Sequence, residues 1–301
     1  MKNIKTIILA IISCLLWSTA FTGVKIGLQY SAPLSFAGLR FMISGLILFF
    51  IFADLKNYFK LILQNLKTVL MLALFQTFIL YALFYTGINM VSGATAAIIV
   101  GFAPLNTAIV AHNTMKDDKM TWKKSLSIMI GLIGIVIISV SRKPWSLQGF
   151  PEFIGIIILF VSSISGAYGN VIVAKEKKNM PPLLLASSQL FIGGTALFLI
   201  SIPIEGTPTF NYPLEFFLAL AWLAFLSAAA FTIWFNLLKK PGVKVSDLNL
   251  WKFIIPVFGA IWAWLILPDE KPQIVQIIGM VCIVLSIIAY HKCVNKDKSC
   301  I

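Results

Sequence analysis

Long apolar stretches without charge alternate with short basic segments along this chain. Residues 7–24, 179–204 and 216–238 contain no Asp, Glu, Lys or Arg, and neither do residues 68–111. The last stretch is too long for one helix and divides at the turn-like INMVSGA, residues 88–94. About 20 apolar residues cross a bilayer as a helix, and the strict alternation typical of a membrane barrel is absent. The pattern therefore predicts membrane-spanning helices.

Ten such spans account for nearly all of the chain and leave no room for a soluble domain. We expect spans at 6–28, 33–53, 66–87, 92–112, 122–141, 152–174, 182–203, 214–238, 246–267 and 272–290. The predicted fold class is an all-α integral membrane protein.

The composition agrees, because 59% of residues are hydrophobic and only 12% are charged. The net charge of +13 could indicate nucleic-acid binding. If the N-terminus is cytoplasmic, however, eighteen Lys and Arg fall on the inner side and three in outer loops. This bias follows the positive-inside rule. It predicts a multi-pass protein of a plasma or inner membrane with both termini in the cytoplasm, and it makes a nucleic-acid partner improbable.

Chemistry-bearing residues are scarce. The two histidines, His112 and His291, lie at span ends, and no spacing of His, Cys, Asp or Glu fits a metal site. The four cysteines form no disulfide framework. The sequence predicts no enzyme, metal or cofactor. The first apolar segment lacks a small-x-small cleavage pattern and reads as a retained helix.

The two halves of the chain repeat one another. PLSFAGLRFMISGLILF (33–49) aligns with PLLLASSQLFIGGTALF (182–198), so that Arg40 matches Gln189 and Gly45 matches Gly194. Further on, Pro104 matches Pro256. Residues 1–145 and 146–290 therefore form two five-helix repeats, and 291–301 is a cytoplasmic tail. Five is odd, so the second repeat must be inverted, and the basic loops switch sides accordingly. Inverted repeats are found in many secondary transporters, with the substrate site near the midplane.

The sequence resembles EamA-type members of the drug/metabolite transporter superfamily over nearly its whole length. The resemblance rests on LLWSTAFTGVKIGL (15–28), APLSFAGLRF (32–41), the AP of GFAPLNTAIVA (101–111) and IIPVFGAIWAWLILPDE (254–270). It implies a ten-helix bundle with inverted symmetry around a central cavity, and transport of small metabolites, often amino acids or related compounds. Many members carry Glu just before the second-repeat proline. This chain has Ile255 there, with Lys252 one turn earlier.

Lys252 has two interpretations. Its ammonium could extend to the inner headgroups, or it could face the cavity and bind a substrate carboxylate. The aligned prolines, each within a span, are either plain kinks or hinges of gating helices, and Arg40 is a third gating candidate. Aromatic candidates could pack or line the cavity, and buried Asn side chains need partners either way. The candidate substrate-binding residues are Trp17, Tyr81, Tyr85, Asn106, Tyr168, Asn170, Gln189, Trp234, Asn236 and Lys252.

These features predict a secondary transporter that moves small organic metabolites by alternating access. Amino acids or related compounds are the favoured substrates. No Asp or Glu lies in the interior of any predicted span, which favours an exporter, facilitator or exchanger over a carboxylate-based proton carrier. The alternatives are a channel, a structural membrane protein, or a transporter of cationic or neutral metabolites such as drugs or nucleosides. The expected partners are the substrate and the bilayer, and the protein could act as a monomer or a homodimer.

Overall fold

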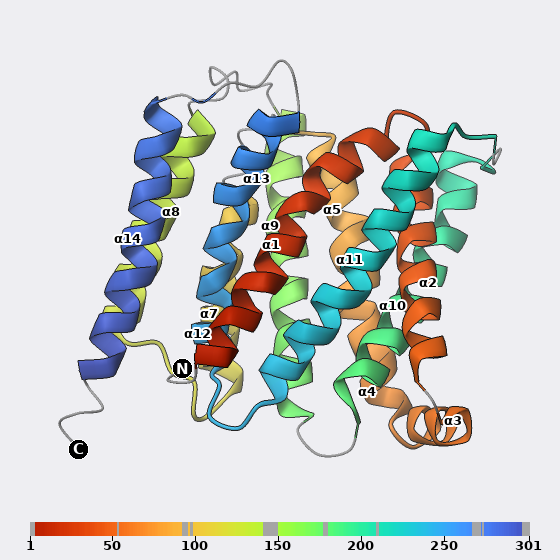
Figure 1. Ribbon diagram of the computed structural model, residues 1–301, viewed down its shortest axis with the longest axis horizontal. Helices are drawn as coiled ribbons and strands as arrows, with labels where there is room; N and C mark the ends of the chain where they lie inside the picture. Colours follow the sequence, from red (N-terminus) through yellow and green to blue (C-terminus); the bar gives the residue numbers. More distant parts are fainter. Residues whose placement is uncertain are drawn as a thin grey trace.

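The computed structural model describes residues 4–52, 54–91, 96, 99–140, 150–176, 180–208, 211–266, 272 and 274–296. Every regular element in these ranges is helical, as the apolar pattern predicts (Figure 1). Six helical stretches are long and apolar enough to cross a membrane: Ile4–Gly27, Pro33–Ile51, Leu66–Ile88, Phe150–Lys175, Pro182–Glu205 and Leu214–Lys239. A shorter apolar stretch covers Ile274–Ala289.

Seven helices follow the predicted spans closely. They are α1 (Ile4–Gly27), α2 (Pro33–Ile51), α8 (Trp122–Val140), α9 (Phe150–Lys175), α10 (Pro182–Glu205), α11 (Leu214–Lys239) and α14 (Ile274–Lys296). Helices α2 and α10 both begin with proline, whose missing amide hydrogen costs nothing in a first turn. Several of the counted loop charges, at 142–143, 177–178 and 271, fall outside the described residues.

The third predicted span is helical throughout but not uniform. It consists of α4 (Leu66–Leu72), a π-helical segment η1 (Ala73–Ile79) and α5 (Leu80–Ile88). A π-helical segment disturbs the normal backbone ladder. Two serine hydroxyls of α9 donate to carbonyls there, Ser165 to Phe75 and Ser162 to Leu80, both at 2.7 Å.

The expectation of one continuous helix is wrong for the fourth and ninth spans. In the fourth, Phe102 is a turn residue and α7 (Ala103–Thr114) begins just after it. In the ninth, the chain passes through α12 (Val245–Asn249), a 3-10 turn η2 (Leu250–Phe253) and α13 (Ile254–Ile266). Both interruptions lie in the spans that carry the aligned prolines.

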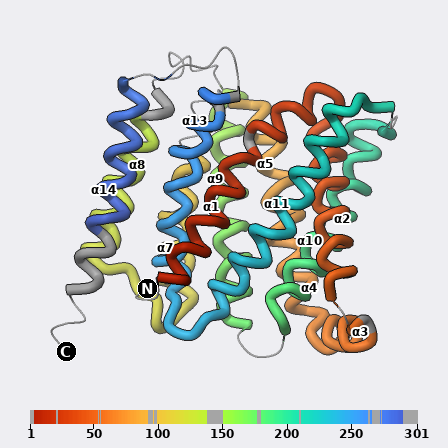
Figure 2. The backbone as a smooth tube through the Cα atoms, viewed as in Figure 1, coloured from red at the N-terminus to blue at the C-terminus, as the bar shows by residue number. Residues whose placement is uncertain are grey.

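The basic segment 54–67, expected to be a loop, contains the helix α3 (Leu55–Gln64). Asp54 caps it by accepting a hydrogen bond from the amide of Asn57 at 3.0 Å. Tyr58 is buried and its hydroxyl lies 3.0 Å from that of Ser187 on α10, so α3 is fastened to the bundle. Figures 1 and 2 show α3, the start of α1 and the connections 115–121 and 240–244 at one end of the bundle, which we call the basic end.

Two helix pairs form the edges of the bundle, and α1 and α9 lie between them. Helix α2 packs on α10 at one edge of the bundle and α8 on α14 at the other (Figure 1). Helix α1 packs on α11 and α13, whereas α9 packs on η1, α5 and α7.

Helices α2 and α10 approach so closely that side chains are excluded at three glycines, Gly38, Gly45 and Gly194. A Cβ on Gly45 would lie 2.5 Å from the backbone nitrogen of Phe191, and one on Gly194 would lie 2.6 Å from that of Met42. Gly45 aligns with Gly194 and Met42 with Phe191 in the sequence repeat, so the two contacts are equivalent. The seam between α2 and α10 is therefore built from backbone.

Candidate functional site

Lys252 lies in η2, where the ninth span changes from a 3-10 turn to an α-helix. Pro256, in the first turn of α13, has no amide hydrogen to offer the carbonyl four residues earlier, which is that of Lys252. Just before the turn, the side chain of Asn249 donates to the carbonyl of Val245 at 2.9 Å. Pro256 and Asn249 therefore both favour an interruption of the ninth helical span at Lys252.

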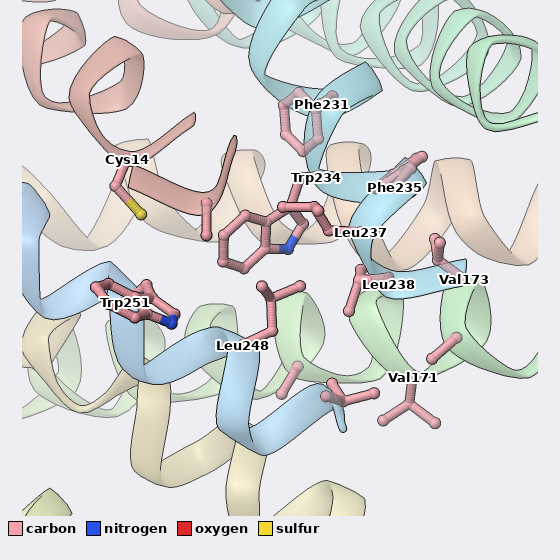
Figure 3. Close-up of a cluster of buried hydrophobic side chains, with 14 of the residues drawn as sticks. Cys14, Val171, Val173, Phe231, Trp234, Phe235, Leu237, Leu238, Leu248 and Trp251 are labelled. Atoms are coloured by element: carbon pink, nitrogen blue, oxygen red, sulfur yellow. The ribbon is translucent and has the colours of Figure 1, made fainter. Parts of the chain in front are cut away.

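Two tryptophans enclose the ammonium of Lys252. Its Nζ lies 4.9 Å from the ring centroid of Trp234 on α11 and 5.5 Å from that of Trp17 on α1. The two indoles meet edge to face at 5.1 Å, and Trp17 also contacts Phe231 at 5.5 Å. Figure 3 shows Trp234 reaching from α11 toward the turn that carries Leu248 and Trp251, with Cys14 of α1 opposite. Such cation–aromatic contacts stabilise a cation by about 1–2 kcal/mol.

A chain of side-chain hydrogen bonds holds the aromatic wall in place. The indole Nε1 of Trp234 donates to Asn170 Oδ1 at 3.0 Å, and Asn170 Nδ2 donates to Asn249 Oδ1 at 3.3 Å. All three residues are buried. The chain links α11 and α9 to α12, so the orientation of Trp234 depends on three elements.

Lys252 has no ion-pair partner among the residues that the structure describes. Within the described part of the chain, no carboxylate lies within ion-pair distance of it, and its side chain is only half-buried. The ring of Trp17 lies 5.5 Å from the Lys252 ammonium. Helix α1 begins with Ile4 at the basic end, and at 1.5 Å per residue Trp17 is about 20 Å along the helix from Ile4. The ammonium therefore lies deep along the bundle, beside the rings of Trp17 and Trp234. A lone cation at such a place favours an anion.

Arg40, Tyr81 and Tyr85 form a second polar cluster. Arg40 is 3% exposed, its Nε donates to Ser227 Oγ at 3.0 Å, and its guanidinium lies 4.7 Å from the ring of Phe41. Tyr81 packs on Phe41 at 4.3 Å and lies 6.5 Å from Tyr85. The guanidinium interacts with both tyrosines. The structure thus brings three candidate residues together on α2 and α5.

Gln189 lies in the interface between α10 and the π-helical segment. It is fully buried and its Oε1 accepts a hydrogen bond from Thr77, whereas its Nε2 has no hydrogen-bond partner. Gln76 Oε1, also buried, is likewise without a partner. Gly193 packs directly on Thr77. The interface is therefore tightly packed and polar.

Three further candidates lie in different surroundings. Asn106 of α7 is buried and donates to Ser163 Oγ of α9 at 2.9 Å. Tyr168 is 42% exposed and packs on Phe75 at 6.0 Å, and Asn236 is exposed on α11. No contact among the described residues joins these three to the Trp17, Trp234 and Lys252 cluster.

The two prolines begin helical segments, whereas the sequence places them inside continuous helices. Pro104 lies in the first turn of α7, just after the turn at Phe102. Pro256 lies in the first turn of α13, just after η2. In both places the proline lies in a first helical turn, where a missing amide hydrogen is tolerated. The interruptions precede the prolines by a few residues.

Sequence reasoning missed two acidic residues that join distant segments. Glu205, the last residue of α10, accepts from the amides of Leu34 and Ser35 at 2.7 and 2.9 Å and so caps α2. Asp118, in the connection before α8, bonds Lys124 and Ser246. Burial raises the pKa of Asp118, but the hydrogen bonds from Lys124 and Ser246 outweigh it and hold that pKa below its usual value. Both acids look like ordinary loop or span-end charges in the sequence, which carries no signal for either pairing.

The described residues contain one large groove away from the Lys252 site and no cluster of metal ligands. No group of three or more His, Cys, Asp or Glu that could hold a metal ion occurs there. A groove of about 880 Å³ runs between α1 and α11, on positions of α1 that do not include Trp17. Its lining is Ile12, Leu15, Leu16, Thr19, Thr22, Gly23, Ile26, Gln29, Tyr30, Glu215, Leu218, Ala219, Trp222 and Trp262.

Apolar helices of membrane-spanning length, an interrupted helix and an internal lysine without an ion-pair partner among the described residues define a polytopic membrane protein of the transporter type. The model of the EamA-like transporter family matches residues 4–140 and again residues 153–290. The chain belongs to this family, which consists of transporters and not of enzymes.

Curated relatives match the chain over most of its length. The uncharacterized transporter YyaM of Bacillus subtilis (strain 168) is 25% identical over 293 residues, covering 96% of this chain and 94% of the relative. An S-adenosylmethionine/S-adenosylhomocysteine transporter of Chlamydia trachomatis serovar L2 is 23% identical over 279 residues, covering 88% and 83%. One solved crystal structure of a protein superposes with a TM-score of 0.81 at 16% identity, covering 96% of both chains. That likeness shows a shared fold.

Proposed function

We propose that this protein is an alternating-access secondary transporter for small metabolites that carry a carboxylate, such as amino acids and related compounds. The observation that carries the proposal is the ammonium of Lys252, enclosed by Trp17 and Trp234 and without a carboxylate partner in the described chain. A substrate carboxylate would supply the missing charge, and the indole faces would contact the rest of the molecule.

Two inverted five-helix repeats, 1–145 and 146–290, would provide the two states that alternating access needs. Three observations support the repeats. The family model matches each half separately. The helix contacts also correspond. Helix α1, the first of its half, packs on α11 and α13, the third and fourth spans of the other half, and α9, the first of the second half, packs in the same way on α5 and α7. The Gly45 and Gly194 contacts are equivalent. In this scheme ten helices surround a central cavity, and the interruptions before Pro104 and Pro256 act as hinges.

The basic end would face the cytoplasm of a plasma or inner membrane. The start of α1 and α3 lie at that end, together with the lysine-rich connections 115–121 and 240–244 (Figures 1 and 2). This arrangement is the one that the positive-inside rule favours. Proteolysis of an epitope tag at either terminus, in sealed and in inverted vesicles, tests the orientation directly.

The substrate class includes the compounds named for the chlamydial relatives. S-adenosylmethionine and S-adenosylhomocysteine each contain an amino-acid group with a carboxylate. At 23% identity the shared chemistry, and not the specific compound, is what we carry over to this chain. Because no Asp or Glu lies in the interior of any predicted span, we propose a facilitator or exchanger driven by substrate gradients.

A binding screen tests the carboxylate site. Purified protein is heated with amino acids, their amides, amines and nucleosides, because a ligand of the folded state raises its melting temperature. Carboxylate-bearing compounds should stabilise the native protein, the corresponding amides should not, and Lys252→Met should abolish the effect. Lys25→Met is the matched control, since Lys25 is an exposed lysine at the far end of α1. Stabilisation by amides or amines that survives in Lys252→Met would refute the proposal.

Transport by reconstituted protein separates a carrier from a channel. A carrier should saturate with substrate, and substrate on the far side should accelerate exchange. Flux that rises linearly with concentration would favour a channel. Proton movement coupled to the substrate at neutral pH would contradict a facilitator or exchanger.

A further inference from the structure

A buried cluster of charges at the basic end joins the first half of the chain to the interrupted helix that carries Lys252. Lys124, near the start of α8, is 3% exposed, and its Nζ lies 2.8 Å from Asp118 Oδ1 and 3.2 Å from Asp247 Oδ1. Asp118 lies in the 115–121 connection and Asp247 in α12. Together with Ser246 these residues form what we call the Lys124 cluster.

The cluster determines where α12 begins. The backbone amide of Ser246 donates to Asp118 Oδ2 at 2.8 Å, and the Ser246 hydroxyl bonds Asp118 as well as Lys124. Lys244, the residue before α12, provides no side-chain cap. The first turn of α12 is therefore capped by a carboxylate more than a hundred residues away in the chain, which stabilises the turn as an ordinary cap would.

The cluster also lies close to the proposed substrate site. Asp247 precedes Lys252 by five residues, which is about 8 Å along a helix. The short α12 and η2 connect the two directly, so a shift of α12 moves Lys252 as well. The cluster is at the basic end of this segment and Lys252 is on its interior side.

We propose that the Lys124 cluster is the gate at the basic end of the transport path. When it is intact it closes the route from Lys252 to that end, and it separates when the cavity opens there. The inference rests on the alternating-access function proposed above. It identifies the gate as an electrostatic contact between the 115–121 connection and α12.

Charges suit a gate better than apolar contacts do. An apolar seal that opens exposes its surface to water and gains nothing in return. Paired charges lose their attraction when they separate, but they regain the hydration that burial had removed. A buried ionic cluster is therefore stabilised by ion pairing when the gate is closed and by hydration when it is open. A gate requires both states to be accessible.

Cys14 provides a reporter inside the protein. It is fully buried on α1, about 15 Å from Ile4 at 1.5 Å per residue, and lies close enough to Lys252 to interact with it. Replacing Cys282, Cys293 and Cys300 with serine leaves Cys14 as the single thiol. A membrane-impermeant maleimide applied from the basic end of reconstituted vesicles should label Cys14 only when the gate opens.

Asp247→Asn weakens the cluster while leaving the Asp118–Lys124 pair in place. We expect it to accelerate labelling of Cys14 from the basic end by at least about tenfold, a modest part of the strength of a buried ion pair. Asp117→Asn is the matched control, because Asp117 is the exposed neighbour of Asp118. It should label at the native rate. Ser246→Ala, which removes hydrogen bonds without changing charge, should give a smaller acceleration.

Stability and gating are separated by measuring each variant well below its own melting temperature. Faster labelling from the basic end alone supports the gate. Unchanged labelling with a lowered melting temperature would assign the cluster a purely structural role and overturn the proposal, as would equal acceleration from both ends. The labelling needs no substrate, so failure of the Lys252 binding test leaves its result readable.

Discussion

Replacing Asn170 with leucine, whose side chain has the same number and branching of heavy atoms but no hydrogen-bonding group, should destabilise the protein strongly. Asn170 bonds Trp234 at 3.0 Å and Asn249 at 3.3 Å, and both partners are fully buried. Leucine would leave one buried donor and one buried acceptor without partners. Each costs about 1–3 kcal/mol, so the free energy of unfolding should fall by about 2–6 kcal/mol.

The same substitution at two other candidate residues provides a graded comparison. Asn106 has one side-chain partner, Ser163, which is half-buried and can reorient, so Asn106→Leu should cost about 1–2 kcal/mol. Asn236 is exposed and makes no side-chain hydrogen bond within the described chain, so Asn236→Leu should change stability by less than about 0.5 kcal/mol.

The assay is the midpoint of thermal unfolding in one detergent, where roughly 2 °C corresponds to 1 kcal/mol for a chain of this length. Asn170→Leu should then lower the midpoint by about 4–12 °C. The reasoning is refuted if Asn236→Leu is as harmful as Asn170→Leu, or if all three variants melt together.

Three further predictions concern the contacts between helices. Glu205→Ala removes the cap of α2 and should cost about 1–2 kcal/mol, and an unchanged melting midpoint would disprove the cap. Gly45→Ala should cost about 1–3 kcal/mol because backbone opposes the new Cβ; Gly23→Ala, which faces only a leucine side chain at 3.1 Å, should cost less in the same assay. Because the pKa of Asp118 is lowered on folding, its stabilisation is complete near neutral pH and is lost as the pH falls below about 4; Asp118→Asn should flatten this part of the melting profile, and parallel profiles would contradict the pairing.

The sequence was sufficient to predict the long helices, because apolar length is what a bilayer demands of a spanning segment. It could not predict the π-helical segment 73–79 or the turn at Leu250–Phe253. Hydropathy is the same for α, π and 3-10 backbones, and what distinguishes them is local bonding, such as the serine hydroxyls of α9 that bond Phe75 and Leu80. The helix α3 was missed since its amphipathic segment is short and basic, as a loop would be.

The sequence predicted which types of residue form the candidate site, but not which of these residues face the interior of the bundle. Trp17, Trp234, Asn170 and Lys252 meet in the structure, because the mid-span aromatic and polar residues that a bilayer disfavours gather where they find partners. Tyr168 looked equivalent in the sequence and is exposed instead. Helical spacing fixes which residues share a face, but it does not say which face turns inward.

The Lys124 cluster could not be predicted from the sequence for a different reason. Its members are 6 and more than a hundred positions apart, with the Ser246 contact spanning 128 residues. Nothing in the spacing of Asp118, Lys124 and Asp247 distinguishes them from the other loop charges. Only the tertiary fold, in which α12 packs on α7, brings the three side chains together.

The contact between α2 and α10 suggests that the protein could assemble from two separately produced fragments. The close contacts at Gly45 and Gly194 are made with backbone atoms of the opposite half and do not depend on the covalent link between the halves. Residues 1–145 and 146–301, produced as two separate polypeptides, should therefore find each other in the bilayer and rebuild the seam. The protein would then behave as a heterodimer of these two fragments.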